Sequence, residues 1–101
     1  MMPMRKKQWY HLDFIYVVKV LTLLYKAEQM GRMLTSTDII IEGGIPSSTF
    51  HTSIKSLMEE AGLIKVEPNP EARAMIVRLC DRGRELAKCL KCVSDFLEEY
   101  K

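Results

Sequence analysis

The chain has 101 residues, 48% of them hydrophobic, and a formal net charge of +2 at pH 7. This length suits a single domain over residues 1–101, and the apolar fraction excludes a disordered chain. The small net charge does not by itself indicate a nucleic-acid-binding protein, so only local clusters of charge are informative. Basic residues gather in two places: at positions 73–91, and at Arg5, Lys6 and Lys7. The second cluster predicts a flexible basic arm over residues 1–7.

Neither a secretory signal nor a membrane span is apparent in the sequence. Its most apolar run, residues 14–25, is shorter than a membrane span and is interrupted by Lys19 and Thr22. The three cysteines are an odd number, which argues against a purely intramolecular disulfide framework. We therefore expect a cytoplasmic protein with reduced thiols and no membrane partner.

The first predicted element is a helix over residues 9–30, ended by Gly31. Apolar side chains are so dense between Phe14 and Leu24 that no clean polar face remains, which predicts burial on more than one side. A short second helix follows and ends at residues 43–44, with the isoleucines of residues 39–41 as its buried side. Its candidate cap residues are Thr35, Ser36 and Thr37.

A third helix is predicted from its cap, Ser47, to Gly62. Pro46 immediately precedes it, as is typical of a helix start. Apolar residues at helical spacing define the side that faces the core: Phe50, Ile54, Leu57, Met58 and Ala61. His51 falls at the edge of that side, and we expect it to be partly packed.

Two short strands, residues 63–67 and 74–79, are predicted to form a hairpin around a loop of turn-forming residues, 68–73. The last element is a helix over residues 81–100. Its apolar residues alternate at spacings of four and three, as in a coiled-coil seam: Leu86, Leu90, Val93, Leu97 and Tyr100. Such a short seam pairs with a second copy of the chain or packs on its own domain, and we favour dimerisation.

The predicted fold is mainly α with a small β-hairpin wing, in the order helix-helix-helix-strand-strand-helix of a winged helix-turn-helix. From residue 34 to the end, the sequence resembles dimeric winged-helix regulators of the MarR-like group. Two segments carry the resemblance: LMEEAGLI at residues 57–64 and LCDRGREL at residues 79–86. Cys80 stands where that group has a threonine cap, and Asp81 is expected to replace it. The small size also resembles winged-helix proteins of archaea and their viruses, and a viral protein would lie in the host cytoplasm.

The resemblance implies a sequence-specific transcription regulator that binds double-stranded DNA as a homodimer. An exposed polar helix face fits the major groove, and the residues expected on that face are Ser47, Ser48, Thr49, Thr52, Lys55 and Ser56. The expected wing contacts are Lys65, Arg73 and Arg78, with Arg73 placed in the minor groove by analogy with the family. The fold alone also permits a protein–protein interaction module without DNA binding.

Cys89 and Cys92 have the spacing of half a metal site, but no second pair of ligands accompanies them. We therefore expect no metal and no cofactor. Burial beside the seam is the ordinary outcome for such cysteines, and a disulfide between two subunits is a sharper hypothesis. It implies a regulator that responds to oxidation. No phosphate loop or nucleophile–base pair is apparent, so the sequence does not predict an enzyme.

Overall fold

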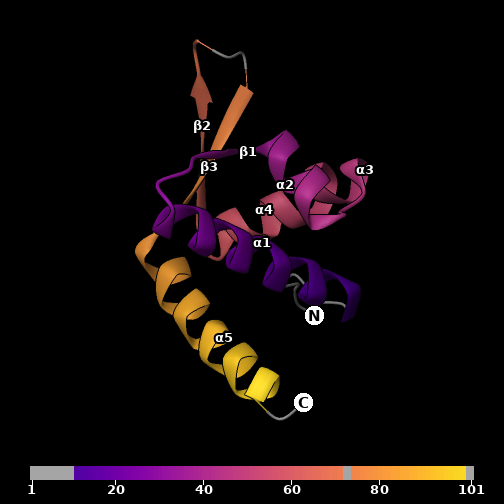
Figure 1. Cartoon of the computed structure of the whole chain (residues 1–101). Coiled ribbons are helices and arrows are strands. Elements are labelled where there is room, and N and C mark those ends of the chain that lie inside the picture. Colours follow the sequence, from indigo (N-terminus) through magenta and orange to yellow (C-terminus); the bar gives the residue numbers. More distant parts are fainter. Residues whose placement is uncertain (1–10, 72–73, 100–101) are drawn as a thin grey trace.

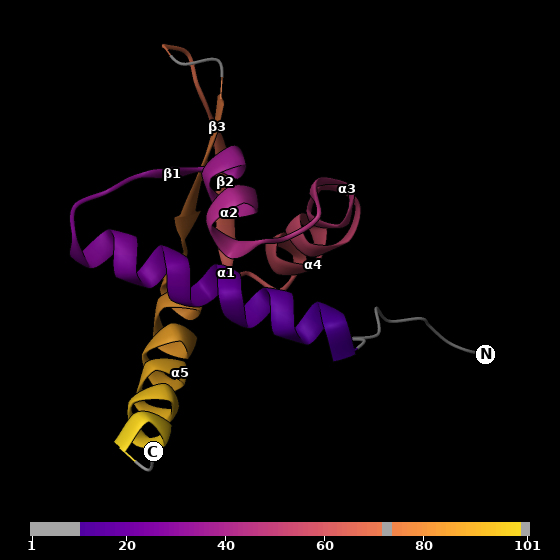
Figure 2. The ribbon, with the colours of Figure 1, turned by 45° about the vertical axis from the view of Figure 1, so that its right-hand side comes forward.

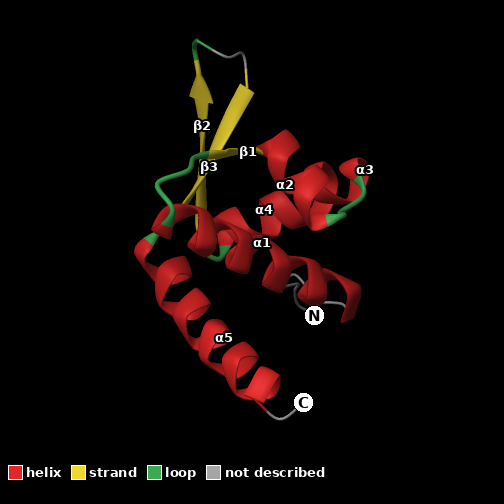
Figure 3. Ribbon diagram, in the orientation of Figure 1, coloured by secondary structure: helices red, strands yellow, loops and turns green. Residues whose placement is uncertain are grey.

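The structure, a computed structural model, describes residues 11–71 and 74–99. Helices pack at the base and along one side of a small sheet, with the β2–β3 hairpin projecting on one side of α1 and α5 on the other (Figures 1 and 3). The predicted fold class, mainly α with a small antiparallel hairpin, is confirmed. The elements in chain order are α1 (His11–Gln29), β1 (Leu34–Thr35), α2 (Ser36–Gly43), α3 (Ser47–Thr49), η1 (Phe50–Ile54), α4 (Lys55–Glu60), β2 (Ile64–Asn69), β3 (Ala74–Leu79) and α5 (Asp81–Glu99).

The sheet has three antiparallel strands in the order β1-β3-β2, one strand more than the sequence predicted. The additional strand, β1, has only two residues, which pair with Val77 and Ile76 of β3 and are too few to give a periodic pattern. Strand β2 extends two residues beyond its predicted end and includes Pro68. Because β2 is an edge strand, the missing N–H of Pro68 is compatible with the sheet.

The core is built around α1, which contacts α2, β3, η1 and α5. Val20 and Leu21 of α1 have no exposed surface, so the predicted burial of this helix on more than one side is confirmed. Phe50, Ile54 and Met58 are likewise fully buried beneath it. The apolar density of α1 therefore reflects contact with several elements at once.

Helix α2 is closed at both ends by its own residues. Of the three candidate caps, Thr35 is the one used: its Oγ1 accepts from the N–H of Asp38 at 3.1 Å, and its N–H donates to Asp38 at 3.0 Å. Gly44 ends the helix with a positive φ of 63°, and Ile45 then donates to the Ile40 carbonyl at 3.1 Å. This closure produces the short turn that leads to Pro46 and α3.

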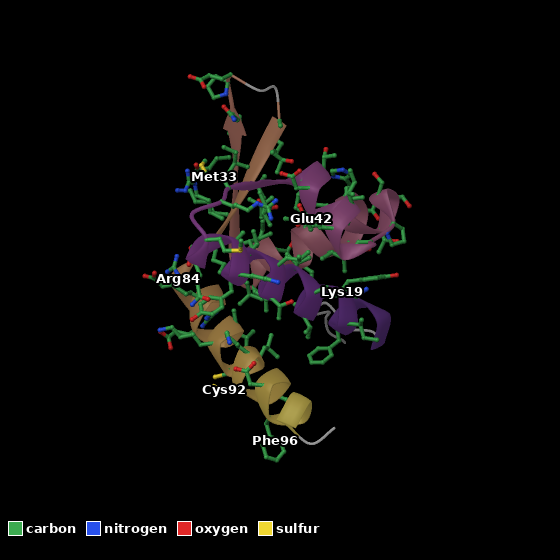
Figure 4. All side chains as sticks on the ribbon, viewed as in Figure 1. Lys19, Met33, Glu42, Arg84, Cys92 and Phe96 are labelled. Atoms are coloured by element: carbon green, nitrogen blue, oxygen red, sulfur yellow. The ribbon has the colours of Figure 1, made fainter. Side chains whose placement is uncertain are left out.

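Helix α5 is attached to the rest of the molecule at its first turn. Arg84 forms two 2.8 Å hydrogen bonds with the carboxylate of Glu28 on α1 and a third, also 2.8 Å, with Asp81. These hydrogen bonds from the guanidinium lower the pKa of Glu28. From this turn α5 runs away from the hairpin (Figures 1 and 2), and Figure 4 shows Arg84 beside the end of α1.

Candidate nucleic-acid interface

A helix-turn-helix is formed by α2, a short turn and the helix that follows. Helices α3, η1 and α4 run on from one another over residues 47–60, which we call the recognition helix. Its inner side is anchored by the fully buried Phe50, Ile54 and Met58 and by Leu57, of which 6% is exposed. The predicted core side of this helix is therefore confirmed, except that Ala61 is half-buried.

The start of the recognition helix differs from the sequence prediction. Pro46 occupies the cap position in place of Ser47, and no side chain bonds to the first backbone N–H groups. Ser47 is the first helical residue instead. Since the early N–H groups of a helix have no intrahelical partner, those of Ser48 and Thr49 are available to an anion.

The outer face of the recognition helix carries small polar side chains. The exposed residues are Ser47, Ser48, His51, Thr52, Ser53, Glu59 and Glu60. The half-buried polar residues are Thr49, Lys55 and Ser56. All six residues expected on this face therefore retain accessible surface, but His51 and Ser53 were missed. His51, expected to be partly packed at the edge of the core side, is exposed, and its ring contacts only the ring of Phe50 among the described aromatic side chains.

A π-helical turn explains why these two residues were missed. The N–H of Lys55 bonds to the carbonyl of Phe50, five residues back instead of four. The wider turn places His51, Thr52 and Ser53 outside, between two fully buried residues. Assignment of faces from the sequence assumed an α-helical period throughout, and nothing in the sequence indicates the change.

The two described cations of the wing share one neighbouring acid as an ion-pair partner. Glu67 on β2 lies 3.2 Å from Lys65 and 3.4 Å from Arg78, its neighbour across the hairpin. A hydrogen bond from Lys65, with a smaller contribution from Arg78, lowers the pKa of Glu67 and keeps it ionised. The third predicted wing residue, Arg73, lies outside the described residues.

The basic residues of positions 73–91 do not form an open cationic patch in the described part of the chain. Arg82 donates to the Ala61 carbonyl at 3.1 Å and so closes the end of the recognition helix. Lys88 and Lys91 pair with acids on α5 itself. The side chain of Lys55, by contrast, forms no ion pair or hydrogen bond with any residue that the structure describes, which leaves its ammonium group available.

The predicted seam on α5 is divided between two faces. Leu90 is half-buried and packs against the chain's own core. The exposed face carries what we call the α5 stripe: Leu86, Cys89, Val93 and Phe96. Phe96 was not part of the predicted seam, and Figure 4 shows its side chain pointing away from α1. The side chain of Leu97 and all of Tyr100 lie outside the described residues.

The cysteines are free thiols, with Cys80 half-buried and Cys89 and Cys92 exposed. We expected Cys89 and Cys92 to be buried beside the seam, but within one chain both are exposed. Over residues 11–71 and 74–99, His, Cys, Asp and Glu side chains do not gather into a group that could hold a metal ion. In the same ranges, the helices are too short or too polar to cross a membrane.

A helix-turn-helix followed by a hairpin in a three-stranded sheet defines a winged-helix protein. The chain belongs to the family of ArnR1-like winged-helix domains, whose model matches residues 6–97. The predicted resemblance to MarR-like winged-helix proteins is likewise confirmed by the solved structures with this fold. No curated protein matches the sequence significantly.

Three solved structures illustrate the likeness. AF1382 from Archaeoglobus fulgidus is 25% identical, with a TM-score of 0.73 over 82% of this chain and 88% of its own. The MarR family transcriptional regulator SPO1453 from Silicibacter pomeroyi is 26% identical, with a TM-score of 0.69 over 85% and 57%. MepR, a transcription regulator of the Staphylococcus aureus efflux pump MepA, shares the fold at 21% identity, with a TM-score of 0.71 over 84% and 60%. The present chain thus spans less than two thirds of the latter two proteins.

Proposed function

We propose that this protein binds double-stranded DNA as a homodimer and regulates transcription at a pseudo-palindromic site. The observation that carries the proposal is the recognition helix, which buries Phe50, Ile54 and Met58 completely and presents a face of small polar side chains. Such a helix is rigidly held and narrow enough to enter a major groove. A MarR family transcriptional regulator of similar fold, SPO1453, supports the same function.

The recognition helix offers DNA both backbone and side-chain donors. The uncapped N–H groups near Ser48 point their dipoles toward an approaching phosphate. Lys55 supplies a cation that is not paired with a described residue, and short hydroxyl side chains approach base edges without filling the groove. Binding of this kind depends on charge and therefore weakens as salt concentration rises.

The α5 stripe supports dimerisation. Leu86, Val93 and Phe96 are 42%, 57% and 57% exposed, an apolar surface that a second copy can cover. In sequence, residues 81–90 of α5 contain three basic and two acidic residues, and the last turns are acidic. An antiparallel pair about a two-fold axis places the acidic end of one copy beside the slightly basic start of the other, with Leu86 opposite Phe96.

Dimerisation through α5 also suits the position of the recognition helix. Helix α5 extends from the side of α1 opposite the wing. A two-fold axis at α5 therefore leaves the helix-turn-helix and the hairpin uncovered (Figure 1). At the start of α1, Phe14 and Ile15 are 55% and 37% exposed and add to the apolar surface available. Two recognition helices related by this axis would read two half-sites about one helical turn apart.

The proposal is tested by titrating labelled random duplex DNA at two salt concentrations and sequencing the bound fraction. We expect salt-sensitive binding and enrichment of an inverted repeat. Ser48→Glu places a negative charge at the start of the recognition helix, where phosphates are expected, and should weaken binding about tenfold or more.

Gln29→Glu is the matched control, because it makes the same charge change at an exposed position at the opposite end of α1 from α3 (Figure 1). Its affinity for DNA should stay within about twofold of the parent protein. Equal effects of the two substitutions would show that the recognition helix is not the contact surface. Absence of binding even at low salt would overturn the proposal.

Glu67→Gln tests the role of the ion cluster on the wing. The substitution removes the carboxylate that pairs with Lys65 and Arg78, so the wing becomes more positive and both cations are released to phosphate. We expect duplex affinity to rise about threefold to tenfold at low salt, with a steeper dependence on salt. Asn69→Gln, further along the same strand, changes no charge and is the control. Unchanged affinity in Glu67→Gln would place the wing away from DNA.

A protein-interaction module is the second candidate. Exposed Glu59 and Glu60 at the end of the recognition helix, and the pairing of the wing cations with Glu67, both disfavour contact with phosphate. Retention of the fold together with no binding of any duplex would favour this function, and partner proteins would then be sought.

A further inference from the structure

We infer that His51 is the main specificity-determining residue of the recognition helix, reading a guanine in each half-site, an inference that rests on the proposed DNA binding. Guanine presents two acceptors, N7 and O6, in the major groove. An imidazole N–H is a donor that matches either acceptor. His51 is exposed and its side chain forms no hydrogen bond or ion pair with the described residues, so its ring nitrogens are available to a base.

The π-helical turn is what presents His51. In this turn the hydrogen bond from Lys55 to Phe50 encloses one more residue than an α-helical turn. His51 is thereby held outside, directly after the fully buried Phe50. Single π-turns within α-helices occur frequently at functional sites, and this one lies in the middle of the proposed contact face.

Packing orients the ring without covering it. The imidazole of His51 meets the ring of Phe50 edge to face, with centroids 5.5 Å apart and an interplanar angle of 75°. Because Phe50 is fully buried in the core, this contact restricts the rotamers of His51 before DNA arrives. Less side-chain entropy is then lost on binding.

The neighbouring side chains are less suited to the same task. The hydroxyl of Thr52 donates to the carbonyl of Ser48 at 2.6 Å, so its proton is already used within the helix. Ser53 is exposed but short, and Lys55 is half-buried at the base of the turn. The exposed Glu59 is an acceptor and cannot pair with the acceptors of guanine. His51 thus combines exposure, reach and a free donor.

The experiment is selection of bound sequences from a random duplex library by the full chain and by His51→Ala. For the parent protein we expect a guanine at a constant position in each half-site. His51→Ala should lose the preference at that position alone and bind the selected site about tenfold more weakly. Its affinity for unrelated duplex and its Tm should be unchanged, which separates base reading from a structural role.

Ser53→Ala is the matched control, because it alters an exposed residue of the same turn and should retain the guanine preference. Retention of that preference in His51→Ala would overturn the inference while leaving the proposed DNA binding intact. Equal weakening on all duplexes would make His51 a phosphate contact and would also overturn it. If the parent protein bound no duplex, both the inference and the proposed function would fail together.

Discussion

Gly83→Ala is expected to destabilise the protein by about 2–3 kcal/mol and to lower Tm by roughly 10 °C or more. A Cβ atom at this position would overlap the carbonyl oxygen of Leu63, which is part of the backbone and cannot rotate away. That oxygen also accepts the N–H of Cys80 at 3.0 Å, so a shift of Leu63 breaks a second contact. Thermal unfolding followed by circular dichroism measures the effect.

Gly43→Ala provides the control for this prediction. Gly43 also lies in a helix, but a Cβ there would meet only side-chain carbons of Leu23 and Ile45, at 3.2–3.4 Å, which move more easily than backbone. Its stability should change by less than about 1 kcal/mol. A higher Tm in Gly83→Ala, the ordinary result of replacing a helical glycine, would contradict the close approach of α5 to residue 63.

Val93→Asp is expected to convert the proposed dimer to monomers. Val93 is central in the α5 stripe and 57% exposed in the single chain, so the substitution should leave the fold intact. A two-fold axis places the change in the interface twice, and the loss of two buried valines amounts to roughly 3 kcal/mol or more. The dissociation constant should therefore rise about a hundredfold or more, measured by analytical ultracentrifugation.

Met33→Asp is the matched control, because Met33 is 53% exposed, is also apolar, and lies outside α5. It should remain dimeric. The measurement is made with and without a thiol reductant, since exposed Cys89 and Cys92 permit the disulfide between subunits proposed from the sequence. A dimer that survives Val93→Asp would move the interface to the start of α1, and one that dissociates only with reductant would depend on that disulfide.

The order of elements and the core side of the recognition helix were predictable from sequence. Periodic apolar residues, Pro46 and Gly62 are local signals that act wherever the segment lies. The helix cap was misplaced by one residue, at Ser47 instead of Pro46. Strand β1 was missed because two residues carry no period and are stabilised only by β3, which lies far along the chain.

Most of the candidate face was also predictable, but its distinctive features were not. Six of the polar residues between Ser47 and Ser56 follow from helical spacing, whereas the exposure of His51 and Ser53 accompanies a π-turn that spacing does not report. Similarly, Lys65 and Arg78 are recognisable as wing cations in sequence. Their pairing with Glu67 depends on the register of β2 against β3.

The sequence by itself determined the winged-helix order, the burial of α1 and the presence of an apolar seam along α5, because each depends on side chains close in the chain. Only the tertiary structure decided how that seam is divided: Leu90 packs on the chain's own core, while Val93 remains exposed. The role of Gly83 likewise follows only from the tertiary structure, because helix propensity alone predicts that a glycine destabilises a helix. That residue is required where α5 meets the backbone of Leu63, a neighbour distant in the chain that no local pattern encodes.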